Sequence, residues 1–167
     1  MPVKHLTLDE MRKSGVAIDG RIMDNGETRI SLKVGQRGYI WTEPSTYKAP
    51  KWQNAHHHKG LRETYIVERG KIALAYVHRM SPAIKYCLVQ VFEQGQIFTN
   101  QPGEDHNVYL FAGAAIHTVQ HGEPVPNPKK TSGVDWYEAD ADFDAWSKSL
   151  SETDITRLDA ESLHRYD

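Results

Sequence analysis

Alternation of apolar and polar residues dominates the middle of the chain and predicts β-strands. Residues 29–35 read Arg-Ile-Ser-Leu-Lys-Val-Gly, the pattern of a strand with one buried face. Similar short runs follow, and glycine- or proline-containing turn signals such as Lys59-Gly60 separate them. We expect strands at residues 29–35, 39–42, 56–58, 63–68, 71–78, 84–92, 96–99, 106–111 and 115–120. Short strands at such regular spacing indicate an all-β barrel or sandwich. An α/β fold would need helices between the strands, and these connections have no room for them.

The two ends of the chain have a helical pattern. Thr7 followed by Glu10 has the spacing of a capping box and predicts a short helix at about residues 8–14. Apolar residues between 139 and 165 recur at helical spacing, which predicts one or two helices packed outside the barrel. Residues 122–133 read as an exposed loop. We therefore expect one domain, residues 1–167, with its barrel core at about 29–122 and a helical extension at about 139–165.

Composition narrows the class of protein. The chain has 167 residues, which is a typical length for a single domain. The 22 acidic and 20 basic side chains give a formal charge of −2, which provides no overall electrostatic attraction for nucleic acid or an anionic membrane. No apolar run reaches the length of about 18 residues that a membrane span needs. The first residues lack the apolar stretch of a secretory signal, and Cys87 is the single cysteine. We expect a cytoplasmic protein.

A cluster of histidines suggests the chemistry. Because side chains alternate along a strand, His56 and His58 point to one face and His57 to the other. Glu63 begins the next strand after a tight turn, so a hairpin can place its carboxylate beside the histidine pair. Two imidazoles and one carboxylate suit a divalent ion such as Zn, Fe, Mn, Ni or Co. A register slip of one residue would make His57 the ligand instead.

A fourth ligand must come from a distant strand. His106 begins a strand three residues after Gly103, where a turn can direct it inward. The rival is His117, which lies in the strand-like run Ile116-His-Thr-Val. We favour His106 as the ligand, and His117 is then a candidate for lining the pocket or for acid–base chemistry.

These residues resemble the cupin superfamily over about residues 52–119. Its first motif, His-x-His-x4-Glu-x6-Gly, is matched by His56, His58, Glu63 and Gly70. Its second motif, Gly-x5-Pro-x-Gly-x2-His-x3-Asn, is matched in part. The matching residues are Gly95, Gly103 and His106. The departures are Gln101 at the proline position, Leu110 at the asparagine position, and Pro102 displaced by one residue.

The resemblance implies a jelly-roll β-barrel with one divalent metal ion in its interior. It implies nitrogen ligands from His56, His58 and His106 and an oxygen ligand from Glu63. By analogy with small cupins, it also suggests a homodimer, and the segment before Arg29 is a candidate for that contact.

Three kinds of function fit such a site. The first is an isomerase or epimerase acting on a sugar or related hydroxy-carbonyl compound, with His117 or Tyr65 moving a proton. The second is an iron-dependent dioxygenase, and the third is a non-catalytic module that binds a small ligand. A weaker option is metal-free epimerisation with a histidine base. Candidates for the substrate pocket are Trp52, Arg62 and Tyr109, which offer stacking surfaces and a positive charge. The fold alone does not distinguish among these functions, because one fold can carry many different activities.

Overall fold

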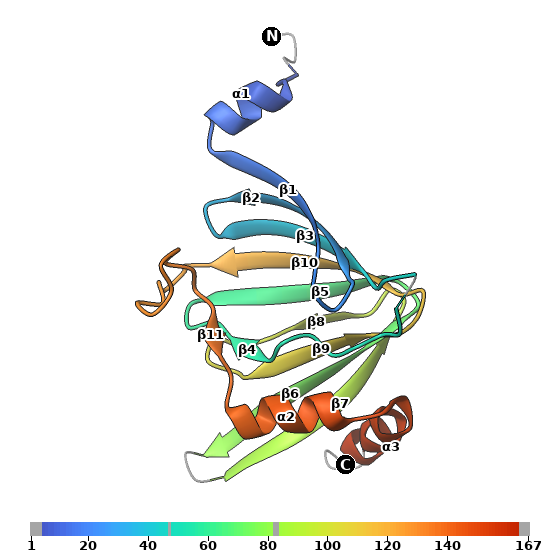
Figure 1. The fold of residues 1–167 in the computed structure, drawn as a ribbon. Helices are drawn as coiled ribbons and strands as arrows, with labels where there is room; N and C mark the ends of the chain where they lie inside the picture. Colours follow the sequence, from blue (N-terminus) through green and yellow to red (C-terminus); the bar gives the residue numbers. More distant parts are fainter. Residues whose placement is uncertain (1–4, 47, 82–83, 164–167) are drawn as a thin grey trace.

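Two antiparallel β-sheets face each other in the computed structural model, which describes residues 5–46, 48–81 and 84–163 (Figure 1). One sheet has six strands. In spatial order they are β1 (Val16–Ile22), β2 (Thr28–Val34), β3 (Arg37–Glu43), β10 (Ala115–Gly122), β5 (Leu61–Arg69) and β8 (Ile97–Thr99). The order is not sequential because β10 returns from late in the chain to lie between β3 and β5. This return connects the N-terminal strands to the strand that carries Glu63.

The second sheet has five strands. In spatial order they are β11 (Tyr137–Glu138), β4 (His56–His57), β9 (His106–Leu110), β6 (Lys71–Ser81) and β7 (Ile84–Glu93). The prediction of an all-β jelly roll is confirmed. Among the described strands, hydrogen bonding does not run from one sheet into the other, so the body is a two-sheet sandwich and not a closed barrel.

Three helices flank the sheets: α1 (Leu8–Lys13), α2 (Ala141–Ser149) and α3 (Glu152–Leu163). Thr7 and Glu10 form the expected capping box at the start of α1. The Asp140 side chain accepts hydrogen bonds from the first turn of α2, as an N-cap residue does. Helices α2 and α3 confirm the prediction of a helical C-terminal extension. No described helix combines the length and the apolar character that crossing a membrane requires.

Apolar side chains fill two layers. The layer between the sheets includes Val67, Leu74, Val108 and Ile116. A second layer lies outside the five-stranded sheet, where Phe143 of α2 and Ile155 of α3 pack among side chains from β6, β7 and β9. The five-stranded sheet is therefore covered on both faces, which explains why its strands read as nearly continuous apolar runs.

The sheet begins earlier than the sequence predicts. Strand β1 pairs along its whole length with β2, although we expected the barrel core to begin near Arg29. Its inner face carries Asp19 and Arg21, and its outer face carries Val16, Ile18 and Ile22. The polar residues thus face inward, so the usual rule of apolar-in and polar-out does not identify this strand. The two-residue strand β11 was also not predicted.

Candidate metal centre

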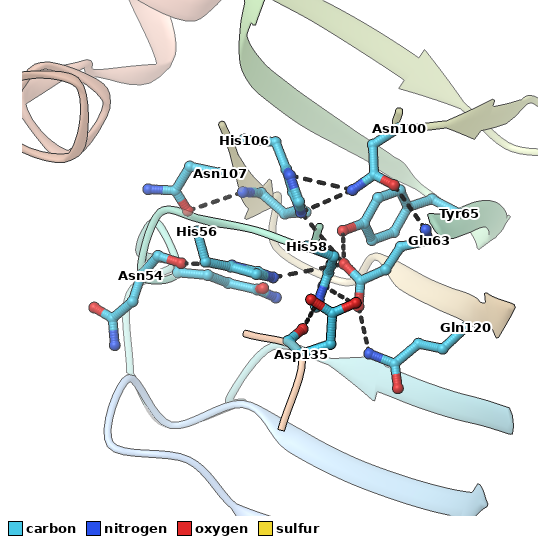
Figure 2. A network of polar contacts seen from close by, with 12 residues as sticks. Asn54, His56, His58, Glu63, Tyr65, Asn100, His106, Asn107, Gln120 and Asp135 are labelled. Atoms are coloured by element: carbon cyan, nitrogen blue, oxygen red, sulfur yellow. Dashed lines mark hydrogen bonds and ion pairs between the residues drawn. The ribbon is translucent and has the colours of Figure 1, made fainter. Parts of the chain in front are cut away.

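Four side chains from three strand regions converge between the sheets (Figure 2). His56 lies on β4 and His58 directly follows it, Glu63 lies on β5, and His106 begins β9. Strand pairing places His56 opposite His106. One nitrogen or oxygen from each of the four residues lies within 4.8 Å of all the others. The structure thus brings together the four residues predicted as metal ligands.

The carboxylate of Glu63 lies at the centre of this cluster. Its Oε2 atom is 3.3 Å from His106 Nε2 and 3.6 Å from His56 Nε2, and its Oε1 atom is 3.5 Å from His58 Nε2. His106 is fully buried, and the His56 side chain retains 12% of its exposure. All three rings therefore present the same nitrogen to one carboxylate in a largely buried setting.

Backbone carbonyls fix the orientation of each ring. His56 Nδ1 lies 3.0 Å from the carbonyl oxygen of Asn54, and His106 Nδ1 lies 2.9 Å from that of Glu104. His58 Nδ1 donates to the carbonyl oxygen of Asp135. Because a carbonyl only accepts, each Nδ1 must carry the proton in the neutral ring. The Nε2 lone pairs are then left free to point at the centre of the cluster, as in metal sites.

One buried atom supports the fit between this cluster and a metal ion. Within the described residues, His58 Nε2 is buried and has no hydrogen-bond partner. Buried polar groups without a partner are costly and rare. A divalent ion at the convergence point would satisfy this nitrogen together with the other two imidazoles and the carboxylate. The donor set of three nitrogens and one oxygen admits Zn, Fe, Mn, Ni or Co.

The protonation states mostly suit metal binding. Burial raises the pKa of Glu63, but the rings of His106 and His56 beside its carboxylate outweigh this effect and hold that pKa well below its usual range. Burial lowers the pKa of His56 to about 4, so this ring is neutral at pH 7. Burial also lowers the pKa of His58, but the neighbouring Glu63 and Asp135 outweigh it and raise that pKa overall. The raised pKa of His58 opposes metal binding at this ring, because a ligand nitrogen must be deprotonated.

Further polar side chains hold Glu63. The Tyr65 hydroxyl donates to Oε2 at 2.5 Å, and Gln120 Nε2 donates to Oε1 at 2.7 Å. The side-chain oxygen of Asn100 accepts from the Glu63 backbone N–H at 2.7 Å, and its amide nitrogen lies 3.0 Å from His106 Nε2. These contacts fix the carboxylate before any ligand binds.

Asp135 fixes the turn that joins the two halves of the site. Its buried carboxylate accepts backbone hydrogen bonds from Lys59, Gly60 and Leu61 at 2.8, 3.0 and 2.8 Å. A side chain at position 60 would place its Cβ 1.9 Å from the carbonyl oxygen of Glu123, so the turn requires glycine there. Because this turn separates His58 from Glu63, Asp135 sets the position of both ligands.

The candidate centre opens into a cavity of about 190 Å³. His56, His58, Glu63 and Tyr65 line one side of it. A larger hollow of about 380 Å³ lies next to it and shares Arg29, Gln53, His56 and Trp136 with its lining. The ring of Trp136 stacks on that of His56, with ring centroids 5.4 Å apart. A small molecule entering from the outer hollow would pass Trp136 to reach the ligands.

The other residues predicted for the site fall into two groups. Tyr65 lines the cavity, and Trp52 lines the outer hollow, although its indole N–H donates to the carbonyl oxygen of Leu150. Arg62 is exposed, because it neighbours the inward-facing Glu63 and so points to the opposite face of β5. Tyr109 packs beneath α3, and its hydroxyl donates to Glu152 at 2.9 Å. The structure therefore places Arg62 and Tyr109 outside the cavity.

His117 also lies outside the cavity. Its neighbours Ile116 and Thr118 line the cavity, so His117 points to the outer face of β10. There its Nδ1 lies 2.6 Å from the Tyr39 hydroxyl, and its Nε2 lies 3.2 Å from Glu68. His117 is thus neither a ligand in place of His106 nor within reach of a substrate at the centre. His57, which pairs with Asp105 at 2.8 Å, likewise points away from the centre.

No protein-family model matches the chain, and no curated protein matches it in sequence. Oxalate decarboxylase from Bacillus subtilis is similar in structure, with a TM-score of 0.53 and 11% identity over 84% of this chain and 37% of that one. The 7S globulin of Momordica charantia has a TM-score of 0.51 and 15% identity over 89% of this chain and 44% of that one. An RmlC-like cupin from Shewanella frigidimarina has a TM-score of 0.47 and 16% identity over 71% of this chain and 91% of that one.

Fold and site together define a jelly-roll protein whose interior holds a cluster of potential metal ligands. The chain has the jelly-roll fold that its two cupin-like sequence motifs predict, and it shares this fold with the oxalate decarboxylase and the 7S globulin. At these identities, structural similarity shows the fold alone. The chemistry of the site depends on the side chains that this chain places there.

Proposed function

We propose that this protein is a metal-dependent isomerase or epimerase acting on a small hydroxy-carbonyl compound such as a sugar. The observation that carries the proposal is the convergence of three histidine Nε2 atoms and the Glu63 carboxylate beside a polar cavity of about 190 Å³. Cavities for drug-sized ligands usually measure roughly 300–1,000 Å³, so the reacting part of the substrate must be small.

The cavity also supplies a hydroxyl group that can act on the substrate. A bound divalent ion would polarise a carbonyl or hydroxyl oxygen of the substrate. Tyr65 lies in the same cavity, and burial followed by the adjacent Glu63 charge raises its pKa well above the ordinary value. Its hydroxyl therefore stays protonated at neutral pH and can donate a hydrogen bond to a substrate oxygen on which negative charge develops. The sequence predicts His117 and Tyr65 as candidate catalytic residues. Because His117 lies on the outer face, Tyr65 is the one that remains.

Deuterium exchange tests this function across many substrates at once, because it detects proton removal beside any carbonyl group. Metal-loaded protein would be incubated anaerobically with a panel of aldoses, ketoses and sugar acids in D₂O, and NMR would detect deuterium beside the carbonyl carbon. We expect exchange that needs the metal and continues without oxygen. Oxygen uptake with iron, and no anaerobic exchange, would instead assign a dioxygenase. Ligand binding without exchange or oxygen uptake would assign a binding module.

Replacement of Tyr65 with phenylalanine should lower the exchange rate by about 100-fold or more, since loss of one hydrogen-bond donor to a developing oxyanion typically costs about 100- to 1,000-fold. The ring remains in place, and Glu63 keeps its hydrogen bond from Gln120, so the bound metal should remain at one ion per chain. Tyr39→Phe is the matched control, because that hydroxyl contacts His117 on the outer face. Equal exchange rates in the wild type and Tyr65→Phe would remove Tyr65 from the mechanism.

One apolar face of the six-stranded sheet is left uncovered. The outer sides of β1 and β2 carry Val16, Ile18, Ile22, Ile30, Leu32 and Val34 in register, without a charged side chain among them. Ile22 is 79% exposed and Val34 is 58% exposed. Helices α2 and α3 cover the outer face of the other sheet, whereas no described element covers this one (Figure 1). A contiguous apolar patch of this kind marks an interaction surface.

We propose that a second copy of the chain covers this apolar face. In a two-fold dimer the same patch meets itself, and an uncharged patch does so without repulsion. Helix α1, which has no buried residue and would be marginal alone, lies next to the edge strand β1 and would gain a surface to pack on in a dimer (Figure 1). Light scattering should give twice the 19.0 kDa chain mass for the wild type and for Val125→Glu, and the single chain mass for Leu32→Glu. A monomeric wild type at micromolar concentration would rule the dimer out.

A further inference from the structure

Basic side chains form the wall of the cavity on the β2 side. Along this strand Arg29, Ser31 and Lys33 point inward and alternate with the apolar residues of the outer face. Arg29 and Lys33 line the same 190 Å³ cavity as His58 and Glu63. The cavity therefore has a wall of metal ligands and a wall of cations.

The charge of Arg29 is already compensated. Its Nη2 and Nε atoms donate to Glu27 Oε2 at 2.7 and 3.2 Å. Glu27 is buried and also accepts from Gln53 at 3.0 Å. This pair adds no net charge, and its role is to hold the guanidinium at the cavity wall.

Lys33 is not compensated in this way. Its ammonium group has no hydrogen bond or ion pair with any residue that the structure describes. Burial lowers its pKa, the charge of Glu63 opposes this effect, and Arg21 and Arg29 add to it. A partly buried cation without a partner is unfavourable unless something else brings a negative charge. Glu63 cannot fully compensate the charge of Lys33, because its own charge also interacts with the three histidines.

The charges around the cavity indicate which kind of molecule can bind in it. A divalent ion and Lys33 together outweigh the single negative charge of Glu63, so the loaded cavity is positive. We propose that the cavity binds a small carboxylate, with Lys33 pairing with its carboxyl group while its neighbouring oxygen atoms face the metal ligands. This inference rests on the proposed function and names the substrate class of the same site: a hydroxy-carbonyl compound that carries a carboxylate.

Lactate and lactamide are suitable probes, because they have nearly the same size and differ in charge. Calorimetry on metal-loaded protein should show tighter binding of lactate than of lactamide. Lys33→Met removes the charge and keeps most of the side chain, so it should weaken lactate binding by at least about tenfold and leave lactamide binding unchanged. Lys13→Met, on the exposed helix α1, is the matched control and should bind both as the wild type does.

Metal content is measured on the same samples and separates the two proposals. Metal at one ion per chain, with lactate bound equally by the wild type and Lys33→Met, would overturn the carboxylate proposal alone. So would equal affinity for lactate and lactamide, or no lactate binding by the wild type. Loss of lactate binding in Lys33→Met from protein that binds no metal would support the anion site and overturn the metal-dependent function. Folding of the variants is checked by their thermal unfolding curves.

Discussion

Replacement of His106 with alanine should weaken metal binding by more than about 100-fold. Loss of a residue that only supports a ligand usually costs 10- to 100-fold in affinity, and loss of the ligand itself should cost more. His106 is fully buried, and its Nε2 lies 3.3 Å from the Glu63 carboxylate that it helps to hold. Competition with a chromogenic chelator measures the change.

Two histidine variants are matched controls for this prediction. His57→Ala changes the residue between two ligands, but that ring points away and pairs with Asp105. His117→Ala removes the ring that the sequence offered as a rival ligand, and the structure places it on the outer face with Tyr39. Both variants should bind metal as the wild type does. Loss of metal in His117→Ala but not in His106→Ala would reverse the assignment.

Replacement of Asp135 with alanine should have the largest effect on stability. The carboxylate accepts three backbone hydrogen bonds in a site where Asp135 is only 1% exposed. Hydrogen bonds to a charged group contribute roughly 1.5–3 kcal/mol each, and the effects of neighbours are not additive, so we expect about 3–5 kcal/mol of destabilisation. Chemical denaturation measures the free energy of unfolding.

The same substitution should also weaken metal binding by about 10- to 100-fold, because Asp135 positions the turn between His58 and Glu63. Asp142→Ala, at an exposed position of α2, is the control and should change stability by less than about 1 kcal/mol. Asp135→Ala protein with wild-type stability and metal affinity would show that the turn holds its shape without this side chain.

The ligand set could be predicted from sequence because local rules determine it. Alternation along one strand puts His56 and His58 on the same side, and a short turn brings Glu63 back to them. The same rule, applied strictly, would have excluded Arg62, which neighbours the inward-facing Glu63. It would also have excluded Tyr109, because His106 points inward three residues earlier on the same strand.

Other features of the site depend on contacts that the sequence does not reveal. Asp135 contacts the turn between His58 and Glu63 although it lies more than 70 residues further along the chain, and no local sequence pattern identifies this role. Arg29 and Lys33 were visible as the polar half of an alternating strand, but the pattern alone suggests that polar residues face solvent. Here the apolar half faces outward, so the cationic wall could be recognised only after the strand had been placed in the sheet.

Anomalous diffraction from crystals of the zinc-loaded protein would locate the ion and so show whether the four converging side chains hold it. We predict one peak per chain at about 2.0–2.2 Å from the Nε2 atoms of His56, His58 and His106 and from an oxygen of Glu63. A peak elsewhere, for example between His57 and Asp105, or no peak in crystals soaked at saturating zinc, would contradict this prediction.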